Sequence, residues 1–190
     1  LYYNDSIGTS PTRTIAGLRS FDQKVILIAG GYDKGVPFTQ LGVEIVGHVK
    51  ALFLTGNTVI DALQTTVVKD FTFAEDILNN LDYQNRKVIL VTCHRRENYG
   101  QPMTNIMTAL RRIADAFPEV ELVYPVHLSP VVQEAAHKYL DNHPRIHLIA
   151  PLAVDEMHNL MARCHLVMTD SGGLQEEARA LGKPVLVLRK

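Results

Sequence analysis

Short apolar runs alternate with amphipathic stretches along the chain. Eight runs rich in Val, Ile and Leu are apolar at successive positions, which is typical of strands buried on both faces of a parallel sheet. They lie at residues 1–3, 25–29, 51–55, 88–92, 121–125, 146–149, 166–169 and 185–188. Apolar residues recur with helical spacing at 12–20, 38–47, 57–67, 103–117, 130–140, 155–163 and 174–181. The alternation predicts an α/β fold of Rossmann-like, three-layer parallel sheets with right-handed crossovers.

One segment interrupts this rhythm. Residues 69–86 hold a short helical piece at 74–81, and a polar run follows at 82–87. We interpret residues 69–86 as a connector between two lobes, which gives a half-domain over 1–68 and a second domain over 87–190. A single continuous, doubly wound sheet is the alternative, because about eight strands lie within the range of large open sheets.

Composition narrows the classes of partner. The chain has 190 residues, enough for a real hydrophobic core, and its 19 basic and 20 acidic residues leave a net charge of −1. We therefore expect neither nucleic acid nor a membrane surface as a partner. The two cysteines, Cys93 and Cys164, make no disulfide scaffold, and no run is long enough to span a bilayer. These features predict a cytoplasmic protein, with no metal site in the His and Cys spacing and no cofactor implied.

Candidate chemistry is concentrated near the C-terminus. The apolar run at 166–169 leads directly into Asp-Ser-Gly-Gly at 170–173, and a helix is predicted immediately behind it. A helix N-terminus presents free backbone N–H groups, and two glycines leave the approach to them unobstructed, so the turn is suited to a phosphate. Glu176 and Glu177 follow within one turn, close enough for a carboxylate to reach a sugar hydroxyl. The alternative is an ordinary strand–turn–helix in which Asp or Ser caps the helix.

Two histidines stand at the ends of predicted strands. His94 opens the run His-Arg-Arg-Glu-Asn at 94–98, whose other members make a functional role credible. His127 follows the strand at 121–125 and either lines a cleft or caps the next helix. Five other histidines have no partner pattern and are predicted to be solvated or structural: His137, His143, His147, His158 and His165.

Four linked motifs carry a resemblance to a known family. They are Thr-Gly-Asn-Thr-Val-Ile-Asp-Ala-Leu at 55–63, Val-Thr-Cys-His-Arg-Arg-Glu-Asn at 91–98, Tyr-Pro-Val-His at 124–127 and Thr-Asp-Ser-Gly-Gly-Leu-Gln-Glu-Glu at 169–177. In order and spacing they resemble the C-terminal half of the non-hydrolysing UDP-N-acetylglucosamine 2-epimerases, which have a GT-B fold. The resemblance implies UDP or a UDP-N-acetylhexosamine held between two Rossmann-like domains. It also implies elimination of UDP and its re-addition after reprotonation at the second carbon of the sugar.

The same resemblance implies a set of site residues in the loops that follow strands. It assigns nucleotide binding to His94, Arg95, Ser171, Gly172, Gly173 and Glu177, with Glu97 and His127 beside them in the cleft. Within this set, His94 lies next to the diphosphate and the sugar and is the candidate catalytic residue. The segment 171–173 resembles a diphosphate cradle, and Glu177 resembles a carboxylate that binds ribose.

The first lobe resembles a different family. The segments 3–18 and 25–35 are similar to the opening of the C-terminal domain of UDP-N-acetylmuramoylalanine–D-glutamate ligase, an ATP-dependent Mur ligase. That resemblance covers about residues 1–54, directs Asp5 and Thr9 toward the nucleotide and the incoming amino acid, and gives Lys34 a role in binding D-glutamate. The simpler interpretation, which we favour here, is a tight loop at 30–35 after a buried strand.

These observations lead to a hypothesis of a chimera with its seam near residues 52–56, either natural or designed. The carboxylates that remove and return the proton belong to the N-terminal domain of the epimerase family, of which the chain carries the closing segment at 55–63. We therefore expect a UDP- or UDP-sugar-binding remnant without efficient turnover. The alternatives are an active UDP-GlcNAc/UDP-ManNAc epimerase, a non-functional recombined scaffold and a Mur ligase fragment.

Overall fold

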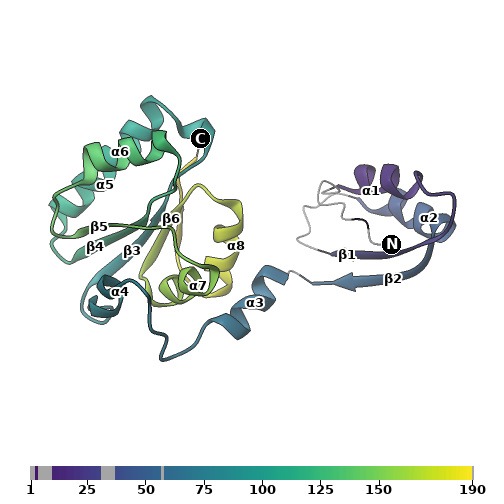
Figure 1. The fold of residues 1–190 in the computed structure, drawn as a ribbon, viewed down its shortest axis with the longest axis horizontal. Helices are drawn as coiled ribbons and strands as arrows, with labels where there is room; N and C mark the ends of the chain where they lie inside the picture. The colour runs from purple at the N-terminus through teal and green to yellow at the C-terminus, as the bar shows by residue number, and fades with distance from the viewer. Residues whose placement is uncertain (1–2, 4–9, 31–36, 57, 190) are drawn as a thin grey trace. The chain divides into compact units, whose positions relative to one another are not determined.

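The chain forms two compact units in a computed structural model (Figure 1), Leu1–Asp61 and Ala62–Lys190. The structure describes residue 3 and residues 10–30, 37–56 and 58–189. Most of the strand predicted at 1–3 lies outside these residues. So do the three ligase-like candidates Asp5, Thr9 and Lys34.

The first unit is a two-stranded parallel ribbon with two helices. Its elements are α1 (Pro11–Leu18), β1 (Val25–Gly30), α2 (Thr39–His48) and β2 (Val49–Thr55). Proline in the first turn of α1 needs no N–H partner there, which favours the start of a helix. Both helices cover one face of the ribbon (Figure 1). Their small core consists of Ile15, Leu18, Leu41 and Val49.

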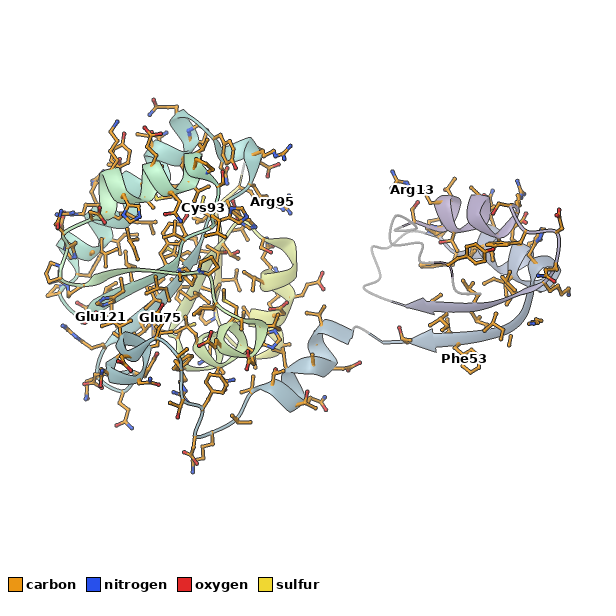
Figure 2. All side chains as sticks on the ribbon, in the orientation of Figure 1. Arg13, Phe53, Glu75, Cys93, Arg95 and Glu121 are labelled. Carbon is orange, nitrogen blue, oxygen red and sulfur yellow. The ribbon has the colours of Figure 1, made fainter. Side chains whose placement is uncertain are left out.

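The other face of this ribbon is exposed. Ile26 and Ile28 of β1 are 55% and 67% exposed, and Phe53 of β2 is 58% exposed. The register pairs Ile28 with Phe53, and Phe53 projects from the strand on the side opposite the helices (Figure 2). The expectation that every strand is buried on both faces is therefore wrong for β1 and β2, because in the structure helices cover only one face of them.

The second unit contains a five-stranded parallel sheet in the order β5-β4-β3-β6-β7. The strands are β3 (Lys87–Thr92), β4 (Val120–Pro125), β5 (Ile146–Ile149), β6 (Leu166–Thr169) and β7 (Val185–Val187). Successive strands extend from β3 to one edge, and the chain then returns to the other side of β3 through β6. The crevice between β3 and β6 is thus a topological switch point, where open α/β sheets bind their ligands.

Helices cover both faces of this sheet and make it a three-layer structure (Figure 1). The second unit also contains α4 (Asp76–Asn80), η1 (Arg96–Asn98), α5 (Gln101–Ala116), α6 (Pro130–Leu140), α7 (Val154–Arg163) and α8 (Gly172–Ala180). One core lies between the sheet and the pair α5 and α6, and includes Met107 and Val132. The other includes Leu160 of α7 and Ala178 of α8. The predicted parallel sheets alternating with helices are confirmed.

The boundary between the units falls inside α3 (Thr58–Thr66). Residues 69–86, predicted to be a connector, belong to the second unit, and Phe73 and Leu78 are buried in its core at 3% and 0% exposure. The polar run at 82–87 suggested a solvated link, but the apolar side chains that precede it determine how the segment packs. The described strands form two sheets, one of two strands and one of five.

Candidate functional site

The carboxyl ends of β3 and β6 lie side by side at the switch point. Thr92 ends β3 and Thr169 ends β6, and their hydroxyl oxygens are 2.6 Å apart in a buried hydrogen bond. The loop after β3 begins at Cys93 and His94, and the loop after β6 begins at Asp170. The pairing of the two strands therefore brings together two motifs that are 76 residues apart in the chain.

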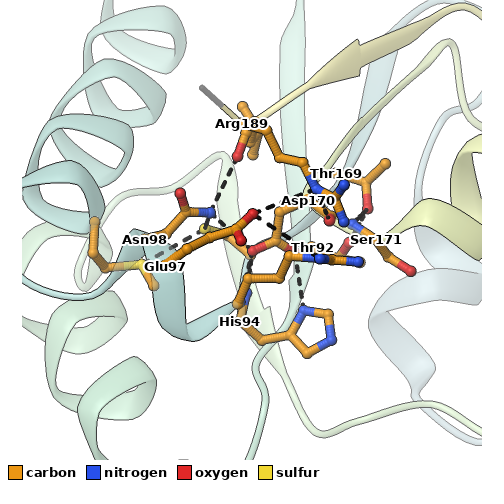
Figure 3. A network of polar contacts seen from close by, with 12 residues as sticks. Thr92, His94, Glu97, Asn98, Thr169, Asp170, Ser171 and Arg189 are labelled. Atoms are coloured by element: carbon orange, nitrogen blue, oxygen red, sulfur yellow. Dashed lines mark hydrogen bonds and ion pairs between the residues drawn. The ribbon is translucent and has the colours of Figure 1, made fainter.

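Asp170 is the centre of a hydrogen-bond network (Figure 3) and is fully buried. Its Oδ2 accepts the backbone N–H of His94 at 2.8 Å, the backbone N–H of Arg95 at 2.7 Å and Nδ2 of Asn98 at 3.0 Å. Its Oδ1 is 3.0 Å from His94 Nδ1. A buried carboxylate with this many donors is well satisfied, and charge-assisted bonds of this kind are the strong ones. Asp170 therefore fixes both the backbone and the ring of His94.

The network has a rim of charged side chains near the surface. Arg189 Nε donates to the backbone carbonyl of Asp170 at 2.9 Å and lies 3.6 Å from Glu97 Oε1. Glu97 Oε1 is also 4.0 Å from Arg95 Nη1. The structure thus brings His94, Arg95 and Glu97 together, as the motif at 91–98 suggests. Because Glu97 is more than half exposed, its ion pairs contribute little to stability.

A pocket of about 190 Å³ opens at this end of the sheet. Its lining includes Cys93, His94, His127, Met157, Ser171 and Leu174. The rings of His94 and His127 face each other across 5.2 Å between centroids. Nδ1 of His127 accepts the backbone N–H of Ser129, the residue before α6. His127 thus lines the pocket and accepts an N–H just before the next helix, but no side chain caps the start of α6.

The start of α8 is open. Ser171 precedes the helix with extended backbone angles, and no side chain caps it. The alternative of a turn capped by Asp or Ser is therefore wrong, because Asp170 is turned toward the loop after β3 instead. A Cβ added at Gly172 would meet nothing within 4 Å, and neither Gly172 nor Gly173 has a left-handed backbone. Neither the backbone nor the packing therefore requires glycine at these two positions. Because no side chain caps the helix, its first N–H groups and the positive end of its dipole are accessible to an anion.

Glu177 lies one turn into α8 and is largely buried, with its side chain 12% exposed. Its Oε2 is 3.5 Å from Nε2 of His158, and its Oε1 is 3.9 Å from the point where a Cβ on Gly173 would stand. Burial raises the pKa of Glu177 above its usual value, and the nearby His158 opposes that shift. The carboxylate therefore lies beside the open start of the helix, as the sequence suggests.

Sequence reasoning missed three residues of this arrangement. The local pattern indicates a possible helix cap at Asp170, includes Asn98 only as the last residue of a motif, and predicts that His158 is solvated or structural. Each acts through a partner more than 70 residues away, or, for His158, 19 residues away on another helix. The one local signal was an aspartate directly after a buried strand, a position at which a carboxylate needs several donors.

The described parts of the chain also bear on other site classes. No cluster of three or more His, Cys, Asp or Glu side chains among them is placed to hold a metal ion. No helix within them has both the length and the apolar character needed to cross a bilayer.

This fold and site define the class of the protein. It is a Rossmann-like α/β protein, and its structural neighbours are of the GT-B type. Residues 40–190 match the sequence profile of the UDP-N-acetylglucosamine 2-epimerase family, and the chain therefore belongs to that family. It is 59% identical over 140 residues to a Clostridium acetobutylicum protein provisionally named for this activity, covering 74% of the chain and 36% of that protein. It is 54% identical over 139 residues to the UDP-N-acetylglucosamine 2-epimerase of Bacillus subtilis, covering 73% of the chain and 36% of that enzyme.

Solved structures give the same result. The co-structure of S. aureus MnaA with UDP superimposes with a TM-score of 0.68 at 32% identity, covering 100% of this chain and 66% of that one. UDP-GlcNAc 2-epimerase from Neisseria meningitidis, bound to UDP-GlcNAc, gives a TM-score of 0.67 at 27% identity and covers 100% of this chain and 67% of that one. The chain spans little more than a third of the length of the curated relatives cited above.

These matches do not support the ligase half of the predicted chimera. The family match begins at residue 40, inside the segment that was assigned to the ligase. The two solved structures cited above align with the whole chain, including that segment.

Proposed function

We propose that this chain binds UDP and UDP-N-acetylhexosamines through its second unit and takes part in 2-epimerisation of the sugar. One observation carries the proposal. At the switch point, the uncapped start of α8 at Gly172 and Gly173 lies opposite His94, whose ring is held by Asp170. The solved relatives that hold UDP and UDP-GlcNAc support this choice of ligand.

The diphosphate would lie at the start of α8. Glycine in a helix costs up to about 1 kcal/mol relative to alanine, and two in succession are hard to explain where nothing crowds a Cβ. A ligand that must approach the backbone closely accounts for them. The first N–H groups and the helix dipole would then stabilise the negative charge of the diphosphate.

His94 would act on the diphosphate side of the sugar. Asp170 occupies Nδ1, which leaves Nε2 on the opposite side of the ring for a ligand in the pocket that His94 lines. When the bond between the sugar and UDP breaks, negative charge grows on the departing phosphate oxygen. A histidine already oriented by a buried carboxylate would stabilise that charge without reorganisation, and it is our candidate catalytic residue.

Glu177 would bind the ribose. Its Oε1 lies beside Gly173, next to the proposed position of the diphosphate, and a carboxylate oxygen accepts hydrogen bonds from a diol. Arg95, Ser171 and Glu97 would complete the surroundings of the nucleotide, with His127 on the facing wall of the pocket.

The sequence leaves several hypotheses open. Among them we propose an active epimerase, in place of a UDP-binding remnant without efficient turnover. Curated relatives that are 54–59% identical to this chain are named for the epimerase activity, one of them provisionally. No contact among the described residues favours a ligase fragment or a scaffold whose loops have no ligand.

Calorimetric titration tests the binding proposal. UDP should bind the folded chain saturably, UMP more weakly and uridine more weakly still, because each step removes phosphate from the helix start. Glu177→Ala should weaken UDP binding roughly tenfold, the typical value of a hydrogen bond to a charged group. A folded chain that releases no heat with UDP would overturn the proposal. Conversion of UDP-GlcNAc to UDP-ManNAc, followed by NMR, tests turnover separately.

A further inference from the structure

Three side chains from three helices form a buried relay that ends at Glu177. Thr66 at the end of α3 lies with Oγ1 2.7 Å from Nδ1 of His158, in the middle of α7. Nε2 of the same ring lies 3.5 Å from Oε2 of Glu177 on α8. His158 is 3% exposed, so its two ring nitrogens have these two partners in place of water.

The geometry determines how the protons are arranged. The Thr66 hydroxyl oxygen is also 2.9 Å from the backbone carbonyl of Ala62, which can only accept. Both contacts are hydrogen bonds only if Thr66 donates to Ala62 and accepts from Nδ1–H of His158. Nε2 then faces a carboxylate oxygen, and that contact is attractive only when a proton lies between the two atoms. The relay therefore holds Glu177 Oε2 through an ion pair or hydrogen bond to His158 Nε2, 3.5 Å away.

The neighbouring residue anchors the relay. Asn159, 1% exposed, donates to the backbone carbonyl of Thr66 at 2.7 Å and accepts the backbone N–H of Val68 at 2.9 Å. Two adjacent residues of α7 thus hold the end of α3 by both its side chain and its backbone. His158 is thus held by its own contact with Thr66 and by those of its neighbour, so its ring is a fixed partner for Glu177.

The two oxygens of Glu177 consequently have different surroundings. Oε2 is bound to the relay, while Oε1 lies beside Gly173 at the open start of α8. We infer that His158 is a positioning residue, which holds Oε2 so that Oε1 is presented to the ribose diol of a bound uridine nucleotide. This inference rests on the proposed function, since it requires that UDP binds at the start of α8.

The test measures how much of the effect of His158 depends on the ribose hydroxyls. Affinities for UDP and for 2′,3′-dideoxy-UDP are measured calorimetrically for the wild type, His158→Leu and His158→Gln. His158→Leu should weaken UDP binding roughly tenfold and leave the affinity for the dideoxy analogue almost unchanged. His158→Gln should recover most of the loss, because its side-chain N–H can still donate to Oε2.

The controls separate positioning from folding. His165→Leu replaces an exposed histidine of the same unit and should change neither affinity. Thr66→Val keeps the shape of the side chain but cannot accept from Nδ1, and it should show a smaller loss confined to UDP. It also provides the test if His158→Leu does not fold.

Two results would overturn the inference while the proposed function stands. One is equal weakening of UDP and dideoxy-UDP by His158→Leu, which indicates a merely structural role. The other is an unchanged affinity for UDP in that variant. A wild-type chain that binds neither nucleotide would instead refute the proposed function, and the inference would fall with it.

Discussion

Strands β1 and β3 contain the same run, Val-Ile-Leu, in very different surroundings. In β3, at the centre of the second unit, Val88, Ile89 and Leu90 are at most 5% exposed. In β1, of the first unit, every second residue faces outward, and Ile26 and Ile28 are more than half exposed. Strand propensity is the same in both, so the number of neighbouring strands and helices decides burial. Only the strand buried on both faces leads into the candidate site.

The same contrast holds for polar groups. The second unit buries Asp170 and surrounds it with donors from the loop after β3. Such a site needs a rigid sheet on both sides, because each donor must be held to within a few tenths of an ångström. The two strands of the first unit offer less support, since a parallel sheet is normally covered on both faces.

The largest effect is expected from Asp170→Ala. The change leaves two backbone N–H groups and the Asn98 amide without their buried acceptor. We expect a loss of about 4 kcal/mol in the unfolding free energy of the second unit, since each stranded group costs about 1–3 kcal/mol. Urea unfolding measures the loss. Asp170→Asn keeps the shape and one acceptor and should lose less; equal losses would show that the donors do not matter.

Shortening one side chain in β3 and one in β1 tests the comparison of the two strands directly. Leu90→Ala removes a fully buried side chain of β3 and should cost about 3 kcal/mol. Ile28→Ala removes a side chain of β1 that is 67% exposed and should change stability by about 0.5 kcal/mol or less. Both are measured by chemical denaturation. A loss at Ile28 as large as that at Leu90 would mean that the outer face of the ribbon is covered in solution.

A smaller effect, and one of opposite sign, is expected at the glycines. Gly172→Ala should raise stability by up to about 1 kcal/mol, because alanine favours a helix and the added methyl group meets no atom. It should weaken UDP binding by placing that methyl group where the diphosphate approaches. Gly42→Ala is the matched control in α2 of the first unit, where an added Cβ also meets nothing. It should give a similar gain in stability, measured by thermal unfolding, with no change in UDP affinity.

The smallest effect concerns the cysteines, both of which are in the second unit. Burial raises the pKa of Cys93 to about 12 and that of Cys164 to about 11. Unfolded thiols ionise near pH 8.5, so above that pH the unfolded state gains thiolate and the second unit should lose some stability. Iodoacetamide labelling should be slow in the native protein at pH 8 and fast in urea. Rapid native labelling would show that this unit opens readily.

Much of this fold is predictable from local pattern. All seven described strands coincide with apolar runs, because successive buried positions leave a clear signal in the sequence. The open start of α8 could also be predicted, since a strand, two glycines and a helix are adjacent in the chain. The exposed face of β1 could not, because the sequence does not show which faces the helices cover.

The hydrogen bonds at the site are harder to predict from the sequence than the strands and helices are. His94 and Asp170 meet only because β3 pairs with β6, and strand order is not encoded in the apolar pattern. His158 reaches Glu177 because α7 and α8 pack against each other, and Thr66 of α3 contacts the other nitrogen of the same buried ring. Local motifs thus indicate the place of a site, whereas the packing of elements determines which side chains hold it.

The most direct measurement is an NMR titration of the 15N-labelled chain with UDP, observing the backbone amides of Gly172 and Gly173. If the open start of α8 receives the diphosphate, these two amide signals should shift most, and they should saturate together with the calorimetric binding curve. Saturable UDP binding that leaves both amides unmoved would contradict the account.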